Sequence, residues 1–215
     1  MESLSRLQLY FKQDEEKERI LNRRDNEEFL EALQPSPNLE YLRIWWYPCT
    51  VFPDWMISLR NLKKLEIGLC NNCERLPPLG KLPCLESLDI LEMRSLKRVS
   101  NEFLGIDSSS LIDVACPKLK SLKFYDMDGW EEWDGESITN KGEEEDDDIA
   151  IMPNLSTLKV YSCPALKALP NYIVQSTSLK DLRILSSTML VDLYSRETGE
   201  DWHKVSLIPN IIFHY

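Results

Sequence analysis

Residues 62–90 read LKKLEIGLCNNCERLPPLGKLPCLESLDI, and this stretch decides the fold. It contains the spacing Leu-x-x-Leu-x-Ile twice, with the first leucines, Leu62 and Leu85, 23 residues apart. The same spacing, with an apolar residue in the third place, occurs at five other sites: Leu4/Leu7/Leu9, Leu39/Leu42/Ile44, Leu119/Leu122/Phe124, Leu155/Leu158/Val160 and Leu179/Leu182/Ile184. The sequence is therefore a repeat, and its period is the first guide to its architecture.

The first leucines of successive triplets are 35, 23, 23, 34, 36 and 24 residues apart. Three of these intervals have the 20–29-residue length of a leucine-rich repeat, and the other three are longer by about half a repeat. With the first leucine as position 1, positions 12 and 15 are apolar in the third to seventh repeats. Position 12 is Cys73, Leu96, Trp130, Leu166 and Leu190, and position 15 is Leu76, Val99, Trp133, Leu169 and Leu193. Because stacked repeats bury such columns against each other, we predict an irregular α/β leucine-rich-repeat solenoid. It has about seven repeats and one short parallel strand in each.

We expect residues 1–215 to form one array with three irregular segments. Residues 14–33 predict a helical insertion, with Asn26 as its N-cap and its end before Pro35. Residues 134–149 contain six consecutive carboxylates and no apolar period, so they predict a disordered acidic loop. Residues 197–215 predict a cap over the last coil through Trp202, Ile208, Ile211, Ile212 and Phe213. The first coil has no such cover, so we expect the chain to be a fragment of a longer one.

Charge and hydropathy exclude several classes of function. The chain carries 25 Lys and Arg against 36 Asp and Glu, a formal net charge of −11. Nucleic-acid binding needs clustered cations, so we expect no nucleic-acid partner. No apolar run approaches the ~20 residues of a membrane span. The first residues have no secretory signal, and we expect a soluble, cytoplasmic protein.

Residues that suggest catalysis or metal binding have simpler explanations in the repeat. Cys70 and Cys73 have the spacing of half a zinc site, but no other cysteine pair completes it. Both fall in repeat columns, so we interpret them as small buried hydrophobes. The carboxylates around Trp130 lack the spacing of a calcium loop, and His203 has no nucleophile motif near it. We therefore expect no metal, no cofactor and no enzymatic activity.

Side chains at positions 3, 5 and 7 of each repeat point away from the core, since neighbours on a strand alternate. We call this surface the concave face. It holds six basic and three acidic side chains (Glu66, Asp89 and Asp181), and position 7 holds four aromatic ones. Exposed Tyr, Trp and Arg dominate protein interfaces. The predicted partner-binding residues are Arg6, Tyr10, Tyr41, Arg43, Trp45, Lys64, Lys123, Tyr125, Lys159, Tyr161 and Arg183. The alternative is an ordinary solvated sheet face, with Tyr10 or Trp45 tucked under neighbouring segments.

Several stretches resemble the C-terminal leucine-rich region of plant disease-resistance proteins of the coiled-coil, nucleotide-binding, leucine-rich-repeat (RGA-like) class. They are NEEFLEALQPSPNLEYLRI (26–44), LPPLGKLP (76–83), PKLKSLKFYDMDGWEEWD (117–134) and ETGEDWHKVSLIPNIIF (197–213). One departure is Leu185-Ser186-Ser187, where such proteins often have a Cys-Pro turn.

The resemblance implies an intracellular sensor that binds a pathogen effector or a modified host (guard) protein. It also implies contact with an adjoining nucleotide-binding domain, held in its ADP-bound state. This chain lacks the phosphate loop of such a domain, because Gly80-Lys81 is followed by Leu82 and preceded five residues earlier by Arg75. ADP binding would then belong to the parent protein only. Two alternatives are the substrate-recognition repeats of a ubiquitin ligase adaptor and an extracellular receptor. The irregular Leu-Pro coils do not match the extracellular receptor.

Overall fold

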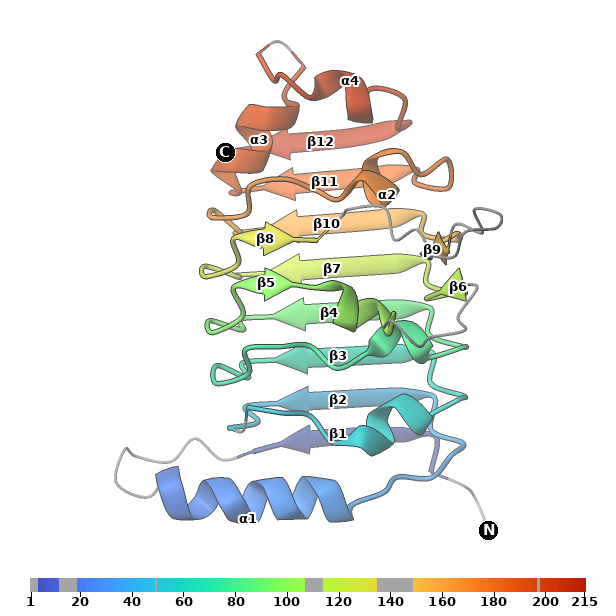
Figure 1. Cartoon of the computed structure of the whole chain (residues 1–215), viewed down its shortest axis with the longest axis vertical. Helices are drawn as coiled ribbons and strands as arrows, with labels where there is room; N and C mark the ends of the chain where they lie inside the picture. The colour runs from blue at the N-terminus through green and yellow to red at the C-terminus, as the bar shows by residue number, and fades with distance from the viewer. Residues whose placement is uncertain (1–3, 12–18, 49, 107–113, 135–148, 197) are drawn as a thin grey trace, which may run out of the picture.

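The main sheet contains eight parallel strands that lie side by side in chain order (Figure 1). The computed structural model describes residues 4–11, 19–48, 50–106, 114–134, 149–196 and 198–215. Within them the strands are β1 (Arg6–Tyr10), β2 (Tyr41–Trp45), β3 (Lys64–Gly68), β4 (Ser87–Leu91), β7 (Ser121–Tyr125), β10 (Thr157–Tyr161), β11 (Asp181–Leu185) and β12 (Asn210–His214). The first seven are the strands of the seven leucine triplets, which confirms the leucine-rich-repeat solenoid.

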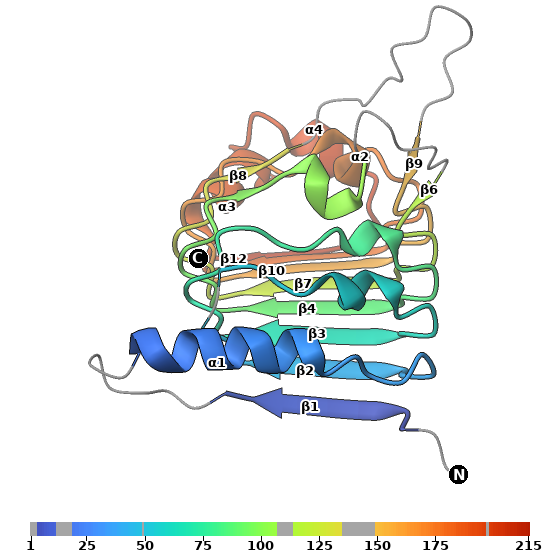
Figure 2. The same cartoon turned by 60° about the horizontal axis from the view of Figure 1, so that its bottom comes forward.

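Return segments form a second layer on one side of the sheet (Figure 2). Two short parallel pairs lie among them: β5 (Arg98–Val99) with β8 (Glu132–Trp133), and β6 (Val114–Ala115) with β9 (Ala150–Ile151). The α-helices are α1 (Arg19–Ala32), α2 (Asn171–Val174), α3 (Thr188–Tyr194) and α4 (Trp202–Val205), and the 3-10 helices are η1 (Asp54–Ser58), η2 (Leu79–Lys81) and η3 (Asn101–Leu104). This convex layer leaves the other side of the sheet, the concave face, uncovered by any described element.

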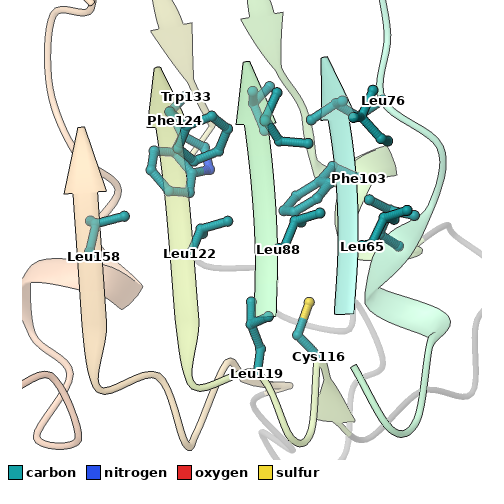
Figure 3. Packing of buried hydrophobic residues seen from close by; sticks show 14 of the residues in the cluster. Leu65, Leu76, Leu88, Phe103, Cys116, Leu119, Leu122, Phe124, Trp133 and Leu158 are labelled. Carbon is teal, nitrogen blue, oxygen red and sulfur yellow. The ribbon is translucent and has the colours of Figure 1, made fainter. Parts of the chain in front are cut away.

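The core lies between the two layers and is built from columns of like residues. Leu65, Leu88, Leu122 and Leu158 project from neighbouring strands toward the same side (Figure 3), and all four are fully buried. Adjacent strands pair position for position, for example Leu65 with Leu88. The stacking of a solenoid follows from this register, because each coil buries its leucines against those of the next.

Trp130 and Trp133 fill the convex part of this core, as the column assignment predicts. Trp130 is fully buried and Trp133 is 7% exposed. The centroids of their rings lie 4.4 and 5.2 Å from that of Phe124, and Figure 3 shows Trp133 beside Phe124. The Trp130 indole N–H donates to the carbonyl of Glu132 at 2.9 Å, so this buried donor is satisfied.

In the main sheet, the residue after each strand from β2 to β11 adopts the left-handed conformation. In these six repeats position 8 has φ between 47° and 59°, although none of the six is glycine. Its backbone N–H donates to the position-7 carbonyl of the next strand, as Ser162 does to Leu185 at 2.9 Å. The six residues are Trp46, Leu69, Glu92, Asp126, Ser162 and Ser186. This repeated geometry turns the chain from the sheet into the convex layer at the same position in each of the six coils.

Position 9 shows how the seventh repeat replaces a cysteine. The thiols of Cys70 and Cys163 each donate to the carbonyl two residues earlier, both at 3.3 Å. Ser187 stands at the same position, and its hydroxyl lies 3.1 Å from the carbonyl of Leu185. It also accepts the backbone N–H of Cys163 at 3.0 Å. A buried serine here therefore has the partners that a buried hydroxyl requires.

The C-terminal segment adds a strand to the sheet. β12 pairs with β11, with Ile211 opposite Leu182 and Phe213 opposite Ile184. Ile208 is buried, so Ile208, Ile211 and Phe213 repeat the leucine spacing with other apolar residues. Ile212 does not cover the last coil as expected, because it alternates to the concave face, where it is 47% exposed.

The helix of the first insertion differs from its predicted start. α1 spans Arg19–Ala32, so Asn26 lies inside it and is not its N-cap. Buried Leu30 anchors the last turn, where its carbonyl accepts the indole N–H of Trp55 at 2.7 Å. The helix ends before Pro35 as predicted. Residues 12–18, and residues 135–148 of the predicted acidic loop, lie outside the described residues.

Candidate partner-binding face

The predicted binding residues all lie on the concave face, since they occupy positions 3, 5 and 7 of six of the eight strands of the main sheet. The parallel register places position 5 of each strand opposite position 5 of the next. From β2 to β11 this row reads Arg43, Glu66, Asp89, Lys123, Lys159 and Arg183. The row therefore has cations at both ends and two carboxylates between them.

At the N-terminal end, one carboxylate serves two cations. Glu66 is 6% exposed. It accepts the Arg43 Nε–H at 2.7 Å and pairs with the Lys64 ammonium at 2.7 Å. Arg43 also donates to the Tyr10 hydroxyl at 3.1 Å. Arg43 and Lys64 therefore already have a carboxylate partner within the protein.

The electrostatics of this network follow from the contacts. Desolvation raises the pKa of Glu66, but the hydrogen bonds from Lys64 and Arg43 outweigh it and hold the pKa below its usual value. The hydrogen bond with Tyr10, followed by those with Glu66, raises the pKa of Arg43. The hydrogen bond with Glu66 also raises the pKa of Lys64. Glu66, Arg43 and Lys64 are therefore all charged at neutral pH.

An aromatic cluster sits beside this network. The ring of Tyr10, which is 52% exposed, lies 6.1 Å from Trp45 and 6.0 Å from Trp46. The two indoles are 5.4 Å apart and near perpendicular. Trp46 occupies position 8 and is therefore not among the predicted binding residues, which are all at positions 3, 5 and 7. The Trp-Trp pair in the sequence is the signal that could have found it.

Trp45 and Tyr41 are less available than the column analysis implies. A Cβ on Gly68 would meet the Trp45 indole at 3.1 Å, so the indole lies across this glycine on the next strand. Tyr41 is 9% exposed, and the Arg6 guanidinium lies over its ring at 4.1 Å. The guanidinium groups of Arg6 and Arg43 thus lie over the rings of Tyr41 and Trp45, in the geometry of cation–π contacts.

At the C-terminal end, the cations are less fully paired. Lys123 pairs with Asp89 at 3.1 Å, and Arg183 makes a bidentate pair with Asp181 at 2.8 and 2.9 Å. Lys159 lies between them and has no ion pair with any described residue. Tyr125 and Tyr161 stand beside it as an edge-to-face pair, with centroids 5.1 Å apart. Burial raises the pKa of Tyr125, so its hydroxyl stays protonated.

Groups with possible chemical roles elsewhere include buried cysteines and a carboxylate cluster that is partly paired. Cys70 and Cys73 are fully buried, and desolvation raises the pKa of Cys116 and Cys163 to about 12. Among the described residues, no three His, Cys, Asp or Glu side chains gather to hold a metal ion. In the carboxylate cluster, Asp134 pairs with Arg98 at 2.7 Å and Glu132 with Lys167 at 3.1 Å.

The convex layer contains a second candidate surface. A pocket of about 410 Å³ lies between η1 and η3, with Phe52, Ile57 and Ile106 among its apolar lining residues. An exposed Arg75–Glu102 pair at 3.6 Å borders it. None of its lining residues belongs to the concave face, so the two surfaces are separate candidates.

Comparison with known proteins agrees with the repeat pattern. Residues 1–93 match the family of R13L1/DRL21 leucine-rich repeats. A putative disease resistance protein of Arabidopsis thaliana is 33% identical over 158 residues, which are 72% of this chain and 10% of that protein. RPP13-like protein 1 of the same plant, a putative disease resistance protein, is 31% identical over 164 residues, 74% of this chain and 15% of the relative. The putative disease resistance protein RGA1 of Solanum bulbocastanum is 48% identical over 69 residues, 31% of this chain and 7% of the relative.

The chain thus spans a small part of each of these relatives. No helix in the part of the chain that the structure describes is long and apolar enough to cross a membrane. The repeat columns, the parallel sheet and these similarities agree. The chain is a leucine-rich-repeat protein homologous to plant disease-resistance proteins over most of its length, with R13L1/DRL21 repeats in residues 1–93.

Proposed function

We propose that this chain is the protein-binding repeat segment of an intracellular plant immune receptor, and that it binds partners through its concave face. The observation that carries the proposal is the open row of cations and aromatic side chains on an array homologous to disease-resistance proteins. Such side chains supply most of the binding energy of protein interfaces. The relatives reported above favour this function over a ubiquitin ligase adaptor.

On this proposal the chain has two kinds of partner. One is a pathogen effector or a modified host protein that the receptor senses. The other is the adjoining nucleotide-binding domain of the same receptor, which the repeats restrain at rest in its ADP-bound form. Both contacts take place in the cytoplasm. The segment itself has no catalytic role.

The test uses the full receptor that carries this chain, expressed in leaf tissue with and without a pathogen isolate that it recognises. The variant combines Tyr10→Ala, Lys159→Glu and Tyr161→Ala, which alter exposed or half-buried groups of the concave face. Arg43 is left unchanged, because reversing its charge would place a second carboxylate beside the nearly buried Glu66 and destabilise the sheet. Loss of restraint gives cell death without the pathogen, and loss of sensing gives no response with it.

The matched control combines Lys180→Glu and Met189→Ala, which are exposed and lie off the concave face. We expect the control to behave as the parent. Protein levels are measured in parallel. A concave-face variant that accumulates normally and signals like the parent in both conditions rules out the concave face. The convex pocket between η1 and η3 then becomes the better candidate.

A further inference from the structure

Two parallel rows run across the C-terminal part of the concave face. Position 5 of β7, β10 and β11 forms a cationic row of Lys123, Lys159 and Arg183. Position 7 of β4, β7, β10 and β11 forms an apolar row of Leu91, Tyr125, Tyr161 and Leu185. All seven side chains are half-buried, so each keeps an accessible part. The two rows differ by two residues along every strand and therefore lie side by side.

The cationic row is an unfavourable arrangement for an isolated sheet. Like charges directly opposite each other on neighbouring strands destabilise a sheet. Lys123 and Arg183 are offset by Asp89 and Asp181, but Lys159 has no carboxylate within ion-pair distance among the described residues. At the N-terminal end of the same face, Glu66 pairs with both neighbouring cations. The charge of Lys159 helps to lower the pKa of Asp181, but Asp181 already forms a bidentate pair with Arg183. Lys159 therefore has no ion-pair partner of its own among the described residues.

We infer that this double row binds an acidic amphipathic helix of a partner protein, with one carboxylate on Lys159 and the helix laid across the strands. The inference rests on the proposed function, because it assigns the partner's chemistry at the same face. The carboxylates of the helix face the cationic row, and its apolar side chains pack on the edge-to-face pair of Tyr125 and Tyr161.

Spacing favours a helix over an extended segment. Neighbouring strands lie about 4.8 Å apart, and successive turns of an α-helix lie about 5.4 Å apart. Carboxylates one turn apart can therefore follow cations one strand apart, and flexible Lys and Arg side chains absorb the small difference. Side chains on one face of an extended chain are about 6.8 Å apart, which fits the strand interval less well. The apolar row distinguishes this surface from a simple phosphate site.

The experiment measures binding of a synthetic peptide to the 215-residue chain by fluorescence anisotropy. The probe is a helical peptide with Glu at every fourth position along one edge and Leu along the adjacent edge. One control peptide has Gln for Glu, and another has the same composition with the two edges scrambled. A single-stranded RNA oligonucleotide is the third control. We expect saturable binding of the probe, weaker binding of both control peptides and no binding of the RNA.

The key variant is Lys159→Glu, and the matched control is Lys180→Glu. Lys180 is exposed, immediately precedes β11, and also has no ion pair among the described residues. We expect Lys159→Glu to weaken probe binding about tenfold, as for the loss of one charge-assisted hydrogen bond. Lys180→Glu should weaken it less than about twofold, since its charge change is screened over roughly 10 Å. Thermal unfolding of both variants shows that the fold is retained.

Three results would overturn the inference: no probe binding up to about 1 mM, equal weakening by the two variants, or tighter binding of the RNA than of the peptide. Because the probe is measured on this chain alone, its failure leaves the receptor experiment intact. Conversely, a receptor that ignores every concave-face substitution contradicts the proposed function even when the probe binds.

Discussion

At the scale of single residues, Glu66 is the group on which the N-terminal part of the concave face depends. It is nearly buried, and Arg43 and Lys64 both reach it from neighbouring positions. A buried carboxylate is stable only when such partners offset its desolvation. Its two cations are therefore part of the fold as well as of the surface.

We predict that Glu66→Gln lowers the free energy of unfolding by about 1–2 kcal/mol at pH 7, because it leaves two cations without their carboxylate. The folded-state pKa of Glu66 is held below its usual value. Its stabilisation is therefore complete above the unfolded-state pKa and is lost as the pH falls through the lower, folded-state pKa. The difference between parent and variant should close below about pH 4. Urea unfolding at several pH values measures this.

The control for this prediction is Glu86→Gln. Glu86 pairs with Lys120 at 2.9 Å on the exposed edge of the array, with side chains 41% and 58% exposed. Exposed pairs contribute little, so we expect Glu86→Gln to change the free energy of unfolding much less than Glu66→Gln does. Equal losses for the two variants, or a Glu66→Gln loss that does not change with pH, would contradict the account of Glu66.

Trp133 is a structural residue of the convex core. Its ring contacts those of Phe124, Trp130 and Tyr172. We predict that Trp133→Ala lowers the free energy of unfolding by about 3–5 kcal/mol and abolishes soluble expression, because truncation leaves a large cavity. Soluble yield and thermal unfolding are the measurements, with Val51→Ala, at a 65% exposed residue, as control. Unchanged yield and melting temperature would show that position 15 is not part of the core here.

At the scale of elements, Gly80 explains the Leu-Pro-Pro-Leu-Gly-Lys-Leu-Pro stretch that resembles a phosphate loop only superficially. A Cβ on Gly80 would lie 2.0 Å from the carbonyl oxygen of Leu104. The glycine therefore lets η2 pack directly on the backbone of η3 in the next coil. It also accepts a hydrogen bond from the N–H of Cys116 at 2.9 Å.

We predict that Gly80→Ala destabilises the array by about 2–3 kcal/mol, because the clash is with backbone and cannot be relieved by a rotamer change. Gly68→Ala is the matched control, since its Cβ would meet only the movable indole of Trp45 at 3.1 Å. It should cost less than about 1 kcal/mol and change the tryptophan fluorescence. The account of η2 packing is wrong if the two substitutions cost the same.

The left-handed residue after each strand provides another prediction. Ser162 has φ 53°, and its N–H is bonded to Leu185. β-Branched residues are strained in this conformation, whereas Asn tolerates it. We expect Ser162→Val to lower the free energy of unfolding by about 1 kcal/mol and Ser162→Asn to leave it unchanged or raise it. Chemical unfolding of both variants decides this, and a Val variant as stable as the Asn variant would contradict it.

The elements that sequence could predict are those set by a period. Leucines at positions 1 and 4 place β1–β4, β7, β10 and β11, and all lie where expected. β12 was missed because Ile208 and Ile211 replace the two leucines of the pattern. The start of α1 was missed because local capping signals at Asn26 compete with a helix that already begins at Arg19.

The candidate site was predictable as a surface but not as a set of contacts. Alternation along a strand assigns Arg43, Lys64 and Lys159 to one face, yet it does not tell which cation a carboxylate will reach. Glu66 reaches two cations, and Lys159 reaches none of the described carboxylates. Trp45 lies flat because its neighbour across the register is Gly68, a fact that only the pairing of β2 with β3 reveals.

At the scale of the whole molecule, the array divides its concave face into two parts. Each coil contacts mainly its neighbours. The cations of β2, β3, β7 and β11 are paired with carboxylates within the array, whereas Lys159 of β10 has no ion pair with a described residue. The first part has its cations fixed by Glu66 and stacked on aromatic rings. The second part keeps Lys159 available beside two tyrosines. On our proposal, a partner's acidic groups bind at the C-terminal part of this face.

The central claim, that a partner covers the concave face, is tested most directly by lysine footprinting. The rates of acylation of Lys159 and Lys180 are compared by mass spectrometry in this chain alone and in the full receptor at rest. Lys159 is half-buried and Lys180 is exposed, so the rate at each lysine in the full receptor is compared with the rate at the same lysine in this chain alone. We predict that the rate at Lys159 falls several-fold in the full receptor while that at Lys180 does not change. An unchanged rate at Lys159, or protection of Lys180 in its place, would contradict the account.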